Sequence, residues 1–395
     1  MPFALDLVRK LHAGGHEVYA SDTFASAGGS HSGALAGHFV TASPEHATVK
    51  FIDDVEGIVR EHEIEMVLPA FEEAFYLATA HDRLDPITTL YTGPFSDLAR
   101  LHDKGTFQRL AVELGLPVPE TVVARSDADL ADAIARWPRW FARAAFSRGG
   151  VALLTNTGPL ADRMKPEDVH PSDDEPWLVQ PFVDGPMNCT YSTLHDGHVT
   201  AHCTYAAPRQ WHHSTGIEFE AIDGGPSLAI IETLGRHLGY TGQLSFDFVD
   251  RGEAGLTLIE CNPRPTDGVL LMSPEQLVDG LMNPEQETTM VEPGKLVELS
   301  FAVFASMFGD GVRNIPSSIH DLLHVKDPNS GWHDHLPTLY SALSLAHHAK
   351  VGWREHKGLF EAMADDMSWD GDPIEGMSAA DRRVLDELES TAASG

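Results

Sequence analysis

The chain has 395 residues, 42% of them hydrophobic, so it is long enough to bury a sizeable core and to form about two to four domains. Its 59 acidic and 27 basic residues give a formal charge of -32, which repels nucleic acid and acidic membrane surfaces and excludes both as expected partners, although life at high salt would also explain the charge. Three cysteines without metal-type spacing, no secretory leader and no membrane-length apolar run predict a cytoplasmic protein.

The first 95 residues predict a parallel α/β domain. A helix is expected over Pro2–Leu11, a strand over Glu17–Ala20 and a second, buried strand over Met66–Pro69, followed by a helix through Glu72 and Glu73. Alternation of strand and helix is typical of a parallel sheet, whose ligand crevice lies at the carboxyl ends of the strands. Glu73 is therefore a candidate for binding an amine substrate, or simply an acid favoured by the helix dipole.

The middle of the chain changes to antiparallel strands. Lys104–Leu114 carries an apolar helical stripe that ends at glycine and proline. Trp140–Ala145 is predicted to be a strand that enters a glycine turn and a second strand, and residues 160–176 form an exposed connection. From Trp177 onward we expect antiparallel strands.

Beyond Gly311 the chain is predicted to be helical and carries no recognisable chemistry. Because tryptophan is costly to leave in water, we expect this region to pack on the core through Trp332, Trp353 and Trp369.

One predicted hairpin carries two carboxylates at positions where they should meet. The apolar runs on either side of the polar turn Asp250–Gly255 predict paired strands, which place Asp247 opposite Glu260 with Cβ atoms roughly 5 Å apart. Because side chains alternate along a strand, Asn262 shares the face of Glu260. Three oxygen ligands on one face suit a hard divalent cation such as Mg²⁺, the alternative being a solvated polar face.

Basic residues and a glycine turn precede this hairpin in the chain. They are Lys104, Arg143, Arg148, Gly149 and Gly150. Backbone amides in a glycine turn can approach phosphate oxygens closely, and the cations offset charge that one Mg²⁺ leaves. The set predicts a polyphosphate site, although each basic residue alone could simply pair with a surface acid or begin a helix.

The order of these features resembles the ATP-grasp superfamily, which includes biotin carboxylase, carbamoyl phosphate synthetase and D-alanine–D-alanine ligase. The resemblance covers about residues 90–274 and rests on "HDKGTFQRLAVELGLPVPET", "FARAAFSRGG", "WLVQPFVDG" and "IECNPR". It implies an α/β and α+β architecture, in which an ATP-grasp fold follows a parallel α/β pre-grasp domain and precedes a mainly helical region. The expected domains are 1–95 (pre-grasp), 96–176 (small grasp subdomain with its linker helix), 177–310 (large grasp subdomain) and 311–395 (helical region).

The start of the chain departs from this family. Relatives begin with a strand and a loop before the first helix, whereas this chain opens directly on "PFALDLVRKL". We expect that the native protein begins upstream of Met1; the alternative is a sheet that lacks a normally central strand and leaves two edges unpaired.

The resemblance implies roles for the nucleotide-binding residues. Lys104 and Arg143 would bind phosphates, with Arg143 in place of the family's second lysine, which keeps the charge and offers a broader donor. Gln180 would meet the adenine amino edge and the backbone near Phe182 the ring nitrogen. The acid that binds ribose is absent from its usual position, so that role passes to Asp184.

The resemblance also assigns the hairpin residues. Asp247, Glu260 and Asn262 match the family's magnesium ligands, and Arg264 matches its substrate-facing arginine. ATP and Mg²⁺ are the implied cofactors, and Mn²⁺ can substitute for Mg²⁺.

The implied activity is an ADP-forming ligation of a carboxylate to an amine, on amino acids or a small specialised metabolite. Arg264 and Arg209 are the expected catalytic residues. His212 and His213 share the loop of Arg209 and could close over the reaction, or could be solvated; Asp267 is a further substrate candidate.

Two alternatives use the same fold. One is an ATP-dependent carboxylase or phosphotransferase, and the other is a non-catalytic nucleotide-binding partner. A homodimer is implied by the resemblance only.

Overall fold

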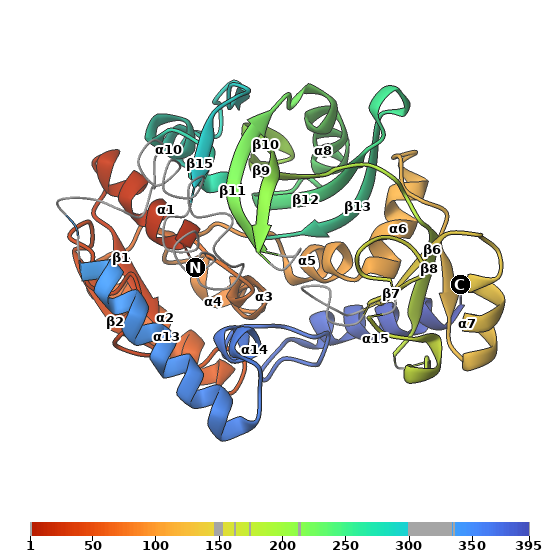
Figure 1. The fold of residues 1–395 in the computed structure, drawn as a ribbon. Coiled ribbons are helices and arrows are strands. Elements are labelled where there is room, and N and C mark those ends of the chain that lie inside the picture. The colour runs from red at the N-terminus through yellow and green to blue at the C-terminus, as the bar shows by residue number, and fades with distance from the viewer. Residues whose placement is uncertain are drawn as a thin grey trace, which may run out of the picture.

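The structure is a computed structural model that describes residues 2–145, 153–161, 163–173, 175–211, 215–298, 334 and 336–394 (Figure 1). It contains a small antiparallel sheet, a large and mainly antiparallel sheet, an N-terminal α/β part and C-terminal helices. The predicted architecture is therefore confirmed. Among the described residues, no helix combines the length and apolar character that crossing a membrane requires.

The N-terminal part alternates helices and strands as predicted. Its elements are α1 (Pro2–Ala13), β1 (Tyr19–Asp22), β2 (Gly37–Val40), α2 (Thr48–His62), β3 (Met66–Val67), α3 (Glu73–Ala78), α4 (His81–Leu84), β4 (Thr89–Leu90) and α5 (Phe95–His102). The pairs β1–β2 and β3–β4 are both parallel but form two separate sheets. Within the described residues, these strands thus form two parallel pairs rather than one continuous sheet.

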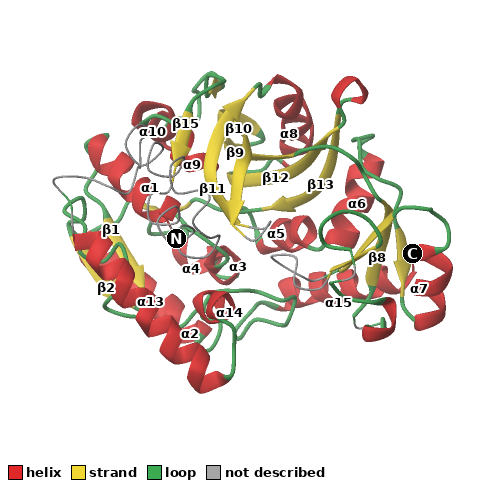
Figure 2. Ribbon diagram, in the orientation of Figure 1, coloured by secondary structure: helices red, strands yellow, loops and turns green. Residues whose placement is uncertain are grey.

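The small sheet follows the linker helix α6 (Lys104–Glu113), whose N-terminus is capped by the Asp103 carboxylate. Its strands pair in the order β5-β8-β6-β7, and α7 packs on one face through an apolar cluster (Figure 2). The elements are β5 (Val122–Ala124), α7 (Asp127–Ile134), β6 (Trp140–Ala144), β7 (Leu153–Thr155), η1 (Pro166–Asp168) and β8 (Trp177–Pro181). The two predicted strands on either side of the glycine turn are thus present as the antiparallel pair β6–β7, while the turn itself lies outside the described residues. Most described residues of the predicted connection at 160–176 are exposed or half-buried.

The large sheet has the order β13-β12-β9-β10-β11-β15, with β14 paired to β10. Its elements are β9 (Met187–His195), β10 (His198–Trp211), β11 (Thr215–Ile222), α8 (Gly225–Leu238), β12 (Gly242–Asp250), η2 (Gly252–Ala254), β13 (Leu256–Asn262), α9 (Gly268–Leu271), α10 (Pro274–Met282), β14 (Thr289–Met290) and β15 (Leu296–Glu298). Apolar residues of α8 pack with those of β12 in one core cluster, while α1, α9 and α10 join a second cluster. Both faces of this sheet are therefore partly covered by helices.

The C-terminal helices return across the N-terminal half of the molecule (Figure 1). They are α13 (Leu336–Glu355), α14 (Leu359–Ala364) and α15 (Ala379–Ser394), and α15 contacts both α5 and α6. Trp369 is 2% exposed, so its predicted packing is confirmed. Trp353 is 81% exposed, so the prediction that it packs on the core is wrong; Trp332 lies outside the described residues.

Candidate nucleotide and metal site

The hairpin β12–β13 places the two predicted carboxylates opposite one another. Asp247 pairs with Glu260 and Ser245 with Asn262 in the antiparallel register, so that part of the prediction is confirmed. The register shifts after this pair because Ile259 forms a bulge, which the sequence did not predict. Asp247, Glu260 and Asn262 therefore share one face of the large sheet.

Arg143 reaches this pair from the small sheet. Its Nη1 lies 2.6 Å from Glu260 Oε2, and its Nη2 donates a 2.8 Å hydrogen bond to the Ile259 carbonyl. The Arg143 side chain is 7% exposed, and its Nε is buried without a hydrogen-bond partner among the described residues. A buried guanidinium edge without a partner can accept an anionic ligand.

The two carboxylates are electrostatically unequal. Burial opposes the charge of Glu260, but the cations of Arg143 and Lys104 outweigh it and lower the pKa of Glu260. Burial and the charge of Glu260 raise the pKa of Asp247. Asp247 is thus the carboxylate that holds a proton most readily, and a cation between the two would release that proton.

The donor set fits a magnesium ion. Two carboxylates and the Asn262 amide oxygen are the hard ligands that Mg²⁺ prefers, and it usually completes its shell with water and phosphate. Among the described residues, no group of three or more His, Cys, Asp and Glu side chains is arranged to hold a metal. A cation at this hairpin therefore needs oxygen ligands beyond the Asp247 and Glu260 carboxylates.

Lys104, in the first turn of α6, acts electrostatically on Glu260. Its side chain is 6% exposed, and burial lowers its pKa although the charge of Glu260 opposes that shift. Because Arg143 also acts on Lys104 electrostatically, the two predicted phosphate-binding cations lie in one neighbourhood. The positions of both, at the junction of the sheets, suit a polyphosphate chain.

The hinge between the sheets contains the predicted adenine-binding residues. Gln180 is 3% exposed, and its Nε2 donates a 2.8 Å hydrogen bond to Thr121 Oγ1. The Phe182 amide donates to the Arg139 carbonyl at 2.9 Å, so a base would need another backbone group here. Asp184 is exposed and forms a two-bonded ion pair with Arg139, at 2.5 and 2.7 Å.

Arg264 lies beside the hairpin, where its guanidinium contacts side chains from both the hairpin and the N-terminal part. Its Nη2 donates a 3.4 Å hydrogen bond to Asn262 Oδ1, its Nε lies 3.5 Å from Glu72 Oε1, and its Cζ lies 4.5 Å from the centroid of the Phe71 ring. Burial raises the pKa of Asp267 to about 6, while Arg264 acts in the opposite direction. The structure thus brings Arg264 into one site with the β12–β13 hairpin and its candidate metal ligands.

Other predicted residues contact partners outside this group or are not among the described residues. Arg209 Nη1 lies 3.4 Å from Glu298 Oε1, in a row across β10, β11 and β15. Glu73 Oε1 accepts a 2.6 Å hydrogen bond from the Ala70 amide, and burial raises the pKa of this carboxyl. Its buried Oε2 has no hydrogen-bond partner within the part of the chain that the structure describes. Outside the described residues lie Arg148, Gly149, Gly150, His212 and His213.

At the hinge, sequence reasoning missed the partners of Gln180 and Asp184. We did not expect the hydrogen bond from Gln180 to the Thr121 hydroxyl or the ion pair between Arg139 and Asp184. Each partner is distant along the chain, and no local motif marks it. The exposed Arg139 could have been noticed only by pairing β6 with β8 in advance.

No family model matches the chain. A solved N5-carboxyaminoimidazole ribonucleotide synthetase with ADP matches with a TM-score of 0.59 at 12% identity, covering 78% of this chain and 82% of that chain. The Staphylococcus aureus N5-carboxyaminoimidazole synthetase with ADP gives 0.58 at 11%, covering 78% and 83%. The biotin carboxylase domain of Hydrogenobacter thermophilus 2-oxoglutarate carboxylase, with MgADP and bicarbonate, gives 0.56 at 12%, covering 75% and 71%.

At these identities the similarity establishes the fold rather than the activity. These structures share the overall fold of this chain, so the predicted ATP-grasp architecture is confirmed as a fold. The chain has the ATP-grasp fold.

Proposed function

We propose that the protein is an ATP-dependent ligase that activates a substrate carboxylate as an acyl phosphate and joins it to an amine, releasing ADP. The observation that carries this proposal is the Asp247–Glu260 pair, contacted by Arg143 of the opposite sheet and lying beside Arg264. Two cations, an oxygen-rich metal position and a second arginine in one site suit a triphosphate and a carboxylate together.

In this mechanism Lys104 and Arg143 bind the phosphates of ATP, while Asp247, Glu260 and Asn262 would hold Mg²⁺. Magnesium supplies positive charge that offsets the phosphate oxygens. A substrate carboxylate oxygen attacks the γ-phosphorus as the bond to the β–γ bridging oxygen breaks, and ADP leaves. The amine then attacks the acyl carbon, inorganic phosphate leaves, and the amine loses a proton.

Arg264 has two tasks in this sequence. Its Nη atoms make hydrogen bonds of 3.4 Å to the Pro265 carbonyl and to Asn262 Oδ1, long enough to be replaced by a carboxylate. It would orient the carboxylate for attack and then stabilise the oxyanion that forms when the amine adds.

The testing experiment measures ADP release with ATP and Mg²⁺ across a panel of amino acids and other small carboxylates, alone and in pairs with amines. Glu260→Ala is the inactive reference. Glu253→Ala, in the exposed turn of the same hairpin, is the matched control and should keep the wild-type rate. Release that needs both an acid and an amine, and that disappears in Glu260→Ala only, supports the ligase.

Two other outcomes of this experiment would favour a different function. The matched synthetase and biotin carboxylase structures make bicarbonate a necessary member of the panel. Release with bicarbonate, or with one acid and no amine, would indicate a carboxylase or phosphotransferase. Binding of ATP without any substrate-dependent ADP release would indicate a non-catalytic nucleotide-binding protein.

A further inference from the structure

Glu72 is a buried carboxylate that connects Arg264 with the C-terminal region. Its side chain is 1% exposed. Oε1 lies 3.5 Å from Arg264 Nε, and Oε2 accepts a 3.1 Å hydrogen bond from the Trp369 amide. Burying a carboxylate is costly unless charges and donors compensate for it, and the Arg264 guanidinium and the Trp369 amide both contribute to that compensation.

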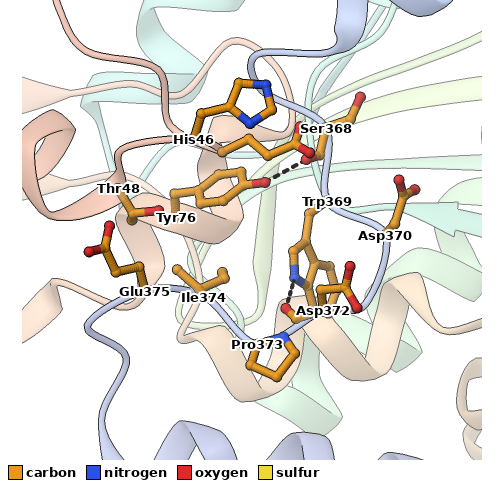
Figure 3. Close-up of a pocket in the computed structure, with 11 residues that line it drawn as sticks. His46, Thr48, Tyr76, Ser368, Trp369, Asp370, Asp372, Pro373, Ile374 and Glu375 are labelled. Carbon is orange, nitrogen blue, oxygen red and sulfur yellow. Dashed lines mark hydrogen bonds between the residues drawn. The ribbon is translucent and has the colours of Figure 1, made fainter.

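The segment that contains Trp369 is fixed by ring packing and by hydrogen bonds, two of which Figure 3 shows, from Tyr76 to Ser368 and from Trp369 to Asp372. The Trp369 ring stacks on Phe75 at 4.6 Å and meets Phe95 edge-on at 5.5 Å. Its Nε1 donates to the Asp372 carbonyl at 2.8 Å, and the Tyr76 hydroxyl donates to the Ser368 carbonyl at 2.5 Å. Residues 368–372, here called the C-terminal strap, thus pack on α3, the helix that begins at the residue after Glu72.

The contact with Glu72 also decides which edge of Arg264 remains available. Glu72 faces the Nε edge, and the Phe71 ring covers one face of the guanidinium. Among the described residues, the Nη edge makes hydrogen bonds of 3.4 Å, to Asn262 and to the Pro265 carbonyl. A substrate carboxylate that replaces these bonds would find Arg264 already oriented.

We propose that Glu72 is a positioning residue for Arg264, and that the Trp369 amide positions Glu72, so that the C-terminal strap completes the carboxylate-binding half of the site. The proposal rests on the ligase function. This role differs from binding of an amine substrate, the role considered for the acids after β3, because the Glu72 carboxylate contacts Arg264 and the strap. The ligand of the completed half-site is a carboxylate anion.

The first test separates positioning from folding by substituting Glu72 in the full chain. Glu72→Gln can still accept the Trp369 hydrogen bond but loses the charge that attracts Arg264. With the carboxylate that the panel identifies, we expect its KM to rise roughly tenfold while the KM for ATP changes less than about twofold. An unchanged carboxylate KM, or an equal rise in both KM values, would overturn the proposal.

The second test needs no turnover. Glu72→Ala removes the acceptor of the Trp369 amide, so hydrogen exchange of the peptide that contains the strap should accelerate by roughly tenfold, the factor expected for one lost hydrogen bond. Glu72→Gln should keep wild-type exchange there. Unchanged exchange in Glu72→Ala would overturn the proposal even if the ligase function stands.

A control variant and a nucleotide probe complete the design. Glu56 forms a 2.6 Å pair with Arg83 on the outer side of the N-terminal part, so Glu56→Gln makes the same substitution in a pair away from the site. It should change neither KM nor the exchange of the strap. Calorimetric binding of the ATP analogue AMP-PNP with Mg²⁺ should persist in Glu72→Ala; loss of binding would mean misfolding, and Glu72→Gln then decides by its KM values.

If the wild-type protein binds AMP-PNP but shows no carboxylate-dependent turnover, the ligase function fails, and with it the role of Glu72 toward a substrate. The exchange experiment still decides whether Glu72 holds the strap. The two failures are therefore distinguishable.

Discussion

Two arginine–carboxylate pairs adjoin the small sheet, and they differ in burial rather than in distance. Arg143 Nη1 lies 2.6 Å from Glu260 Oε2, and Arg139 Nη1 lies 2.5 Å from Asp184 Oδ2. The Arg143 side chain is 7% exposed, whereas those of Arg139 and Asp184 are 49% and 66% exposed. Charges interact strongly where water is excluded, while exposed pairs contribute little. Distance alone therefore says little about which pair matters for function.

The largest effect should come from removing the charge of the buried pair. Glu260→Gln keeps the size of the side chain but leaves Arg143 and Lys104 without their shared carboxylate. We expect ADP release to fall at least about 100-fold. The free energy of unfolding should fall by about 2 kcal/mol, less than the roughly 3–5 kcal/mol of a fully buried pair, because Glu260 is partly exposed. A coupled assay and urea unfolding measure the two quantities.

The exposed turn of the same hairpin provides the control for this variant. Glu253→Gln should match the wild-type protein in both measurements, since that side chain is exposed. A wild-type rate in Glu260→Gln would show that the buried pair takes no part in the reaction.

At the exposed pair, the glycine beside Asp184 should matter more than the ion pair. Gly185 has a φ of 150°, and a Cβ there would lie 2.0 Å from the Asp250 carbonyl oxygen. We expect Gly185→Ala to lower the free energy of unfolding by about 3 kcal/mol, since both the backbone conformation and the contact oppose a side chain. Urea unfolding tests this value.

Gly252 is the matched control, because its φ is 61° but nothing lies within 4 Å of a Cβ added there. Gly252→Ala should cost only about 1 kcal/mol, the conformational part alone. Equal effects of the two substitutions would show that the close approach to Asp250 is unimportant.

The unequal pKa values in the buried pair predict how magnesium binding depends on pH. Burial and the charge of Glu260 raise the pKa of Asp247 to about 7, and Mg²⁺ requires the deprotonated carboxylate. The apparent affinity for Mg²⁺ should therefore rise about tenfold per pH unit below that pKa and level off above it. Titration of Mg²⁺ by calorimetry at several pH values measures this slope.

The folding stability of the metal-free protein should depend on pH in the opposite direction from the Mg²⁺ affinity. Because the pKa of Asp247 is higher in the folded than in the unfolded state, its contribution to stability is present at acid pH and lost as the pH rises through about 7. Mg²⁺ should accordingly raise the Tm more at pH 8 than at pH 6. Asp247→Asn should abolish the difference; if it persists, another group is responsible.

The hairpin was predictable from the sequence because its information is local. Two apolar runs and a glycine-containing turn determine the register of Asp247 with Glu260 across a short span. The bulge at Ile259 was not predictable, since it depends on contacts made by the finished sheet. The fold was predictable from the order of the motifs along the chain, because that order is the one found in the resembling family even where single residues, such as Arg143, differ from its pattern.

Contacts between distant segments were not predictable. The partner of Arg143 lies 117 positions away, and the Trp369 amide meets Glu72 across 297 positions. Burial was also only half predictable: Trp369 is buried among aromatic rings, whereas Trp353 lies on the exposed side of α13. Hydrophobicity predicts that tryptophan side chains tend to be buried, but the packing of neighbouring elements determines which tryptophan is buried.

The smallest effect should come from the exposed pair itself, and it decides whether Asp184 binds ribose. If Asp184 only pairs with Arg139, Asp184→Asn should leave the unfolding midpoint and the affinity for ATP close to wild type, because solvent screens the pair. If Asp184 binds ribose hydroxyls, the wild-type protein should prefer ATP over 2′,3′-dideoxy-ATP, and the variant should lose that preference. Calorimetry with both nucleotides measures the difference. Asp132→Asn, on the exposed side of α7, is the matched control and should keep any preference that the wild type shows.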